Sequence, residues 1–355
     1  MSLVDLVAVE LVLAAFAGGA FGAAIGALPS FSLAGLVVVV GELYAIAVRS
    51  VGGAVPVDVT GGVAFGVVLG PHVAFGGGAA AVAYASRRGY FDSTGERHDP
   101  KDVTRGLGSR PDVLAVGGVF GVVGYLIATV SGSLAIPVDP VALGVVGSAL
   151  AHRAALGYSV VGACAGRRLD MSSGRGPASD ESLRADGGDS ATGGARAAVD
   201  PWLPYQYRWA HVVTLGFVVG VLAAYTAYLT GSAFLAFGIT VAALVLLCAD
   251  VSEIPVTHHM ALPASTVVIA LAGVSGGGPA PGVVSSSVSL GVALAVGGAF
   301  GVLGGVLGEL AQRVFYAHAE THLDPPAASI VVTSGLIGVL AFAGVLPAGA
   351  WVPLP

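Results

Sequence analysis

The sequence has 355 residues, of which 55% are hydrophobic and only 10% are charged, and its formal net charge is −6. A soluble domain carries about 25% charged residues to cover its surface. The composition therefore excludes a soluble globular protein. It predicts a polytopic protein of the cell membrane whose main partner is the lipid bilayer, and it gives no support to a nucleic-acid partner.

Ten apolar segments follow one another along the chain, each near the roughly 20 residues that span a bilayer as a helix. The first five are expected at 6–28, 31–48, 62–85, 113–130 and 139–163. The second five are expected at 209–229, 232–249, 254–274, 288–308 and 326–346. The predicted fold is an all-α transmembrane helix bundle of two five-span repeats, 1–163 and 209–355. Between them, 164–208 is rich in Gly, Ser, Asp and Arg, which predicts a disordered cytoplasmic linker.

The two halves are imperfect copies of each other. Residues 116–124 read VGGVFGVVG, and residues 296–304 read VGGAFGVLG. Upstream of these strings, His72 aligns with His259. Internal duplication of a hydrophobic chain is common in membrane transporters.

Basic residues decide the expected orientation of the copies. Six Lys and Arg residues lie in the loop 86–112, whereas the matching loop 275–287 has none. The positive-inside rule then places 86–112 and the linker in the cytoplasm and both termini outside. Because each half has an odd number of spans, the copies would be inverted. The alternative treats 62–85 and 254–274 as re-entrant loops, which leaves four spans per half and parallel copies.

The third span of each half contains helix breakers beside histidines. Proline removes a helical hydrogen-bond donor and clashes with the preceding turn. Freed backbone groups at membrane depth are tolerated when they are buried in protein or face a wet cavity. Breaks at matching places in two halves therefore indicate a transporter binding site, although proline can also simply kink a packed helix. The candidate residues are Gly70, Pro71, His72, His258, His259 and Pro263.

Other ionisable residues fall inside the predicted spans. Glu42 lies two-thirds along the second span and is a candidate for proton or cation coupling, with an interfacial glutamate as the alternative. Arg153 either snorkels to the cytoplasmic surface or binds an anion within the bundle. His72 and His259 can carry protons or bind a substrate, or they can steady kinked helices through hydrogen bonds.

Two further patterns have structural interpretations. Asp139 and Asp324 each precede a proline, which is typical of a helix N-cap with proline at the first helical position. His318 and His322 have the i, i+4 spacing of a metal pair, but they fall in a polar loop without cysteines. We therefore expect no metal site. The sequence also lacks nucleotide-binding and metalloprotease motifs, so neither a cofactor nor an enzymatic activity is expected.

Three strings carry a resemblance to known sequences: 26–29 (GALP), 70–78 (GPHVAFGGG) and 257–263 (THHMALP). They resemble uncharacterised permease-like membrane proteins, a family with a domain of unknown function. The resemblance covers most of the chain outside the linker and implies no activity. The architecture is similar to that of secondary transporters with five-plus-five inverted repeats.

These patterns together favour a secondary transporter, or permease, of a small polar or anionic solute or ion. Alternating access would arise when one repeat rocks against the other. The alternatives are a channel or a structural or interaction membrane protein, with an intramembrane enzyme in third place. Assembly of identical copies is left open.

Overall fold

The computed structural model describes residues 8–91, 99–162, 169, 206–276 and 278–355. Within these residues the chain is helical, and its one β-type contact is an isolated bridge between Ser275 and Ala350. The prediction of an all-α fold is confirmed. Most of the predicted linker 164–208 lies outside the described residues.

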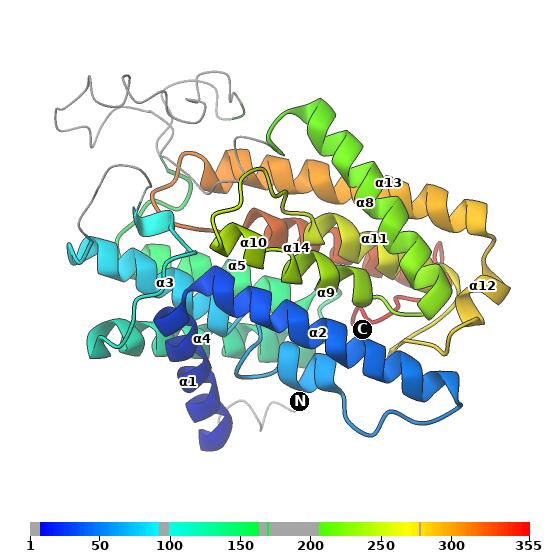
Figure 1. The fold of residues 1–355 in the computed structure, drawn as a ribbon, viewed down its shortest axis with the longest axis horizontal. Helices are drawn as coiled ribbons and strands as arrows, with labels where there is room; N and C mark the ends of the chain where they lie inside the picture. The colour runs from blue at the N-terminus through cyan, green and yellow to red at the C-terminus, as the bar shows by residue number, and fades with distance from the viewer. Residues whose placement is uncertain (1–7, 92–98, 163–168, 170–205, 277) are drawn as a thin grey trace.

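The first half runs from blue to green in Figure 1. Its α-helices are α1 (Val9–Ile25), α2 (Ala27–Ser50), α3 (Ala74–Arg87), α4 (Pro111–Ser133) and α5 (Pro140–Ala155). A π-helical turn η2 (Thr60–Ala64) precedes α3, and a short 3₁₀ turn η3 (Asp99–Lys101) follows it. Gly26 separates α1 from α2 with a φ of 103°, a value that only glycine adopts readily.

The second half runs from green to red in Figure 1. Its α-helices are α8 (Trp209–Thr230), α9 (Leu235–Ala242), α10 (Val245–Cys248), α11 (His258–Leu271), α12 (Val283–Ser287), α13 (Leu290–Ala311) and α14 (Pro325–Phe342). The π-helical turn η4 (Gln312–Tyr316) extends α13. The predicted span 232–249 is therefore divided between α9 and α10.

Five of the described helices are long and apolar enough to cross a membrane: α2, α4, α8, α14 and α13 with its extension η4. Shorter apolar helices occur at Val9–Ile25, Leu235–Cys248 and His258–Leu271. Many large apolar side chains of the long helices are exposed, for example Phe217 on α8 and Phe342 on α14. Lipid is the natural environment for such a surface, so several of these helices are suited to a membrane.

The same backbone crossing occurs in each half. A Cβ atom on Gly19 of α1 would lie 2.2 Å from the carbonyl oxygen of Gly117 on α4. A Cβ atom on Gly220 of α8 would lie 2.5 Å from the carbonyl oxygen of Gly297 on α13. Glycine therefore lets the two backbones touch, as in many membrane helix pairs. The matching strings 116–124 and 296–304 supply one partner of each crossing.

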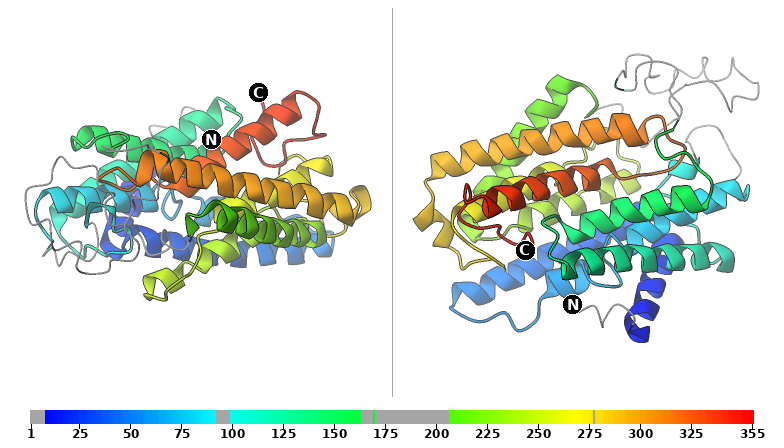
Figure 2. Two further views of the ribbon diagram at one scale, coloured as in Figure 1. Left: turned by 90° about the horizontal axis from the view of Figure 1, so that it is seen from above. Right: turned by 180° about the vertical axis from the view of Figure 1, so that it is seen from behind.

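Two further helix pairs join the halves, and both are antiparallel. In the pair α2 and α9, Gly35 adjoins Val241 whereas Val38 adjoins Gly238. In the pair α5 and α14, the backbone N–H of Asp139 donates to Ser334 Oγ, 2.8 Å away. At the far end of α5, His152 Nε2 lies 3.3 Å from Thr321 Oγ1, just before α14 begins. The second pair lies side by side in the rear view of Figure 2.

The third segments of the two halves differ from the expected single broken spans. In 62–85, the chain leaves the helical path after η2 and resumes it only at α3. In 254–274, residues before His258 are not α-helical, but α11 runs through Pro263 without interruption. A proline inside a helix frees the carbonyl four residues earlier, here that of His259. That oxygen packs against Gly304, where a Cβ would lie only 2.3 Å away.

Candidate functional site

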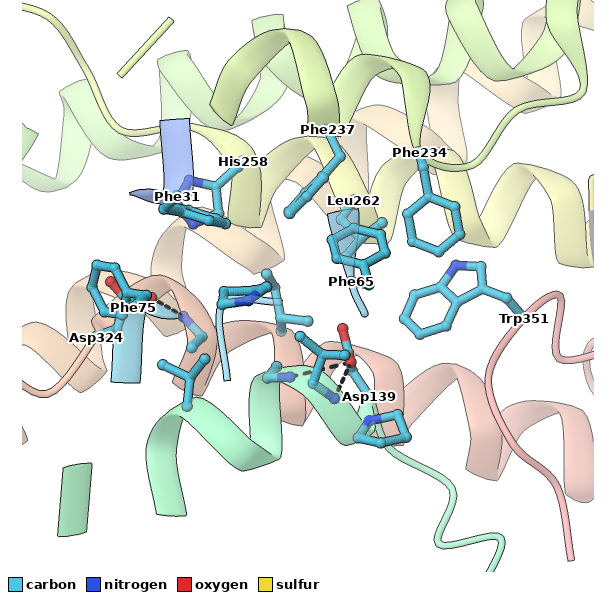
Figure 3. Close-up of a pocket in the computed structure, with 17 residues that line it drawn as sticks. Phe31, Phe65, Phe75, Asp139, Phe234, Phe237, His258, Leu262, Asp324 and Trp351 are labelled. Carbon is cyan, nitrogen blue, oxygen red and sulfur yellow. Dashed lines mark hydrogen bonds between the residues drawn. The ribbon is translucent and has the colours of Figure 1, made fainter. Parts of the chain in front are cut away.

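A cavity of about 150 Å³, hereafter the central cavity, lies where the two halves meet (Figure 3). The N-terminal ends of α5 and α14 both reach it, as do α2, α9, α11 and the chain after α14. Its wall is mostly apolar. The lining residues used below are Phe31, Phe65, Pro71, Phe75, Asp139, Ala142, Phe234, Phe237, His258, Asp324 and Trp351.

Two aspartates place the helix starts at the cavity. Asp139 Oδ1 accepts hydrogen bonds from the backbone N–H groups of Val141 and Ala142 at 2.8 and 3.2 Å. Asp324 Oδ2 accepts one from the N–H of Ala327 at 2.8 Å. Each cap satisfies N–H groups that the first helical turn leaves without partners. The predicted N-caps are confirmed, and both side chains also line the cavity.

Aromatic rings form the greater part of the wall. Phe31 of α2 meets Phe75 of α3 and Phe237 of α9 edge-on, with centroid separations of 5.9 and 6.3 Å. Phe65 contacts Phe234 at 5.4 Å, and Phe234 contacts Trp351 at 5.2 Å. Edge-on and tilted contacts of this kind are the favoured arrangements of aromatic pairs. The two halves thus meet across rings drawn from both.

His258, the first residue of α11, is the third polar group of the wall. It is 3% exposed and packs edge-on against Phe31 at 5.2 Å. Its Nδ1 atom is buried and has no hydrogen-bond partner among the described residues. A buried nitrogen without a partner is costly, so His258 has hydrogen-bonding capacity to offer a ligand.

A second, more polar cavity of about 410 Å³ adjoins the first and is hereafter the Glu42 cavity. Glu42 is buried, and its Oε1 accepts from Thr60 Oγ1 at 2.7 Å while its Oε2 accepts from Ser232 Oγ at 2.6 Å. The two hydroxyls come from different halves of the chain. Arg49 and Asp58 also line this cavity.

Three rings lie between the two cavities because they line both: Phe65, Phe234 and Trp351. Figure 3 shows them grouped on one side of the central cavity, with Phe31, Phe75 and His258 on the other. Trp351 Nε1 donates to Thr266 Oγ1 on α11 at 2.9 Å, which fixes its ring. The three rings are called the aromatic partition below.

The predicted site residues fall into two groups. Pro71 and His258 line the central cavity, and Glu42 lines the second one. Gly70, His72, His259, Pro263 and Arg153 line neither. The helix breaks of the two halves thus meet at one cavity, but through Pro71 and His258 rather than through the aligned histidines.

His72 and His259 instead occupy matching places in the packing. The backbone hydrogen bonds at the first break leave out the carbonyl of His72, since Gly76 N donates to Pro71 O and Gly77 N donates to Val73 O. Its carbonyl oxygen packs against Gly124, where a Cβ would lie 1.7 Å away. This reproduces the contact between the His259 carbonyl and Gly304. The aligned histidines therefore share a backbone role.

Arg153 is fully buried and lines neither of these two cavities. Its Nη2 donates to the carbonyls of Phe315 and Thr321 at 2.8 and 2.7 Å, and its Nε donates to Thr321 Oγ1 at 3.0 Å. Nη1 donates to the carbonyl of Val160. Arg153 thereby ties the end of α5 to the segment before α14.

From the sequence, Asp139 and Asp324 are expected only as caps, and no sequence pattern singles out the aromatic residues of the wall. The equivalent positions of the two aspartates in the repeats could have indicated a shared site. No sequence pattern indicates that Trp351 belongs to it. No cluster of three or more His, Cys, Asp or Glu suited to a metal occurs in the part of the chain that the structure describes.

A family model described as "Family of unknown function (DUF7973)" matches residues 1–355. The match confirms the resemblance to an uncharacterised family. No curated protein and no solved structure matches the chain.

Proposed function

Since the chain belongs to a family of unknown function, we propose its activity from the geometry: a secondary transporter that carries a small solute through the central cavity. The observation that carries the proposal is the pair of cavities separated by the aromatic partition. Binding sites at the interface of two repeats, reached through a broken segment, are typical of such transporters.

We further propose that the ten predicted segments all cross the membrane as two inverted five-span repeats. The antiparallel pairs α2–α9 and α5–α14 join equivalent helices, as a two-fold axis perpendicular to those helices requires. α3 and α11 are too short to span alone. The non-helical residues next to them, 70–73 and 256–257, are buried in protein, which is the condition for such backbone at membrane depth, whereas 65–69 and 250–255 are partly or fully exposed.

In this proposal the Glu42 cavity is the access route from one side of the membrane. The opposite side is closed by the segment before α14, which Arg153 holds. Lys101 reinforces this closure, because its Nζ donates to the carbonyl of Tyr316 at 2.6 Å and lies 4.5 Å from the centre of that ring. Glu42, bonded to both halves, is the coupling group, since protonation would weaken its hold on the two hydroxyls.

Uptake into liposomes tests the proposal. Full-length protein is reconstituted and exposed to an equimolar mixture of small amines, alcohols, carboxylates and amino acids, and the contents are identified by mass spectrometry. We expect saturable uptake of at least one compound, abolished by Ala142→Trp, which fills the central cavity. Val332→Trp, on the exposed face of α14, is the matched control and should transport normally.

Flux that does not saturate, together with conductance in a planar bilayer, would identify a channel instead. Saturable uptake that Ala142→Trp leaves unchanged would show that the solute takes another path.

A further inference from the structure

We infer that the ligand of the central cavity is a small organic cation with an apolar body, such as a single-ring ammonium compound. This inference rests on the proposed function for the statement that the central cavity is a binding site. It does not require transport, because it concerns only which ligand binds. It follows from the charges, rings and size of the wall.

The first step is the charge of the wall. Its charged side chains are the carboxylates of Asp139 and Asp324, and no Lys or Arg is among its described lining residues. Asp324 Oδ1 lies 3.5 Å from His322 Nε2, a potential positive partner. Asp139 has no ion-pair partner among the described residues, and it is only 8% exposed.

The second step concerns the free oxygen of Asp139. Oδ1 accepts both hydrogen bonds of the cap, whereas Oδ2 accepts none from the described residues. A buried carboxylate without a partner is costly, and a cation within reach removes much of that cost. The caps also occupy the N-termini of α5 and α14, which would otherwise attract an anion.

The third step is the aromatic wall. The faces of Phe and Trp rings attract cations, more strongly away from water. Six rings surround the cavity: Phe31, Phe65, Phe75, Phe234, Phe237 and Trp351. His258 adds a ring nitrogen without a partner, which can accept a hydrogen bond from an ammonium group when the imidazole is neutral. Rings and carboxylate together suit an apolar molecule with one positive end.

The fourth step is size and access. An engineered apolar cavity of about 150 Å³ holds one benzene molecule, so the central cavity, at about 150 Å³, is of single-ring size. The adjoining cavity has two carboxylates, Glu42 and Asp58, against the single guanidinium of Arg49. A net negative approach concentrates cations and repels anions.

Three probes of nearly equal shape test the inference on purified full-length protein in detergent: benzylammonium, benzyl alcohol and benzoate. Titration calorimetry, corrected with protein-free micelles, gives each affinity. We expect benzylammonium to bind at least about 10-fold more tightly than the other two. Asp139→Asn keeps an N-cap side chain but removes the charge, so it should abolish that preference while leaving benzyl alcohol unchanged. Glu10→Gln, an exposed carboxylate change on α1, should change nothing.

A wild-type preference for benzoate or benzyl alcohol, the absence of benzylammonium binding, or a full preference in Asp139→Asn would each overturn the inference. The wild-type comparison keeps the test decisive even if the variant misfolds. Benzylammonium binding, with no compound of the mixture taken up into liposomes, would refute the transporter and leave this ligand class standing. Uptake of a carboxylate that Ala142→Trp blocks would support the transporter and refute this ligand class.

Discussion

Alanine at two equivalent glycines, Gly124 and Gly304, should destabilise the protein strongly, and alanine at Gly132 and Gly291 on the same helices should not. Gly124 on α4 and Gly304 on α13 each adjoin the carbonyl oxygen of an aligned histidine, His72 or His259. Neither oxygen accepts the usual helical hydrogen bond. The N–H of Gly76 donates to Pro71 instead of His72, and Pro263 has no N–H to donate to His259. Both contacts involve backbone, which cannot turn aside as a side chain can.

The distances set the expected magnitude. A Cβ would lie 1.7 Å from the oxygen at Gly124 and 2.3 Å at Gly304, far inside van der Waals contact. Overpacking a core costs about 1–3 kcal/mol and occasionally more, whereas Gly→Ala in a helix gains up to about 1 kcal/mol. We expect a net loss of about 2 kcal/mol, larger at Gly124. Gly132→Ala would meet Pro140 at an ordinary 3.6 Å, and Gly291→Ala would meet nothing within 4 Å.

Thermal melting of the purified protein in detergent, followed by circular dichroism, measures the difference. At about 2–4 °C per kcal/mol for chains of 150–250 residues, Gly124→Ala should melt several degrees below wild type, and Gly132→Ala at or above it. Gly304→Ala and Gly291→Ala should repeat the contrast on α13. Equal melting of the two variants on either helix would refute the packing argument.

Three other predictions concern single side chains. Arg153→Ala should lower the melting temperature by leaving buried carbonyls without donors, at about 1–3 kcal/mol each, and Arg153→Lys should not restore it because one ammonium cannot replace the guanidinium fork. Glu42→Gln should fold normally but lose saturable uptake in liposomes, and normal uptake would remove Glu42 from the coupling role. In a chain without its native cysteines, Leu134→Cys and Ser285→Cys should react with an impermeant thiol reagent from one side and Arg88→Cys from the other; labelling of the first two from opposite sides would overturn the inverted topology.

The sequence carried enough information for the fold class and for several helix starts. Low charge and long apolar runs led directly to a helical protein, because lipid-exposed backbone must satisfy its own hydrogen bonds. Asp139-Pro140 and Asp324-Pro325 placed the starts of α5 and α14 correctly, since a cap is a local interaction. The aligned strings 116–124 and 296–304 located the glycines that contact the histidine carbonyls.

Other features depend on contacts that are distant in sequence. Phe65, Phe234 and Trp351 form one partition although nearly 290 positions separate the first from the last. Pro263 was expected to break its helix or to kink it, whereas α11 runs through it and the carbonyl oxygen that it frees packs against Gly304. Neither outcome follows from local propensity, and both require the packed structure.

The difference between local patterns and distant contacts also explains why the proposed ligand is a cation although the sequence favoured a polar or anionic solute. A helix N-terminus attracts an anion where its first N–H groups are free. At α5 and α14 the caps themselves fill those positions, so each helix start brings a carboxylate to the cavity instead of an open donor. Asp139 Oδ2 then accepts no hydrogen bond from the described residues, and the side chain is only 8% exposed. An N-cap at a repeat interface can therefore reverse the charge that a helix terminus attracts.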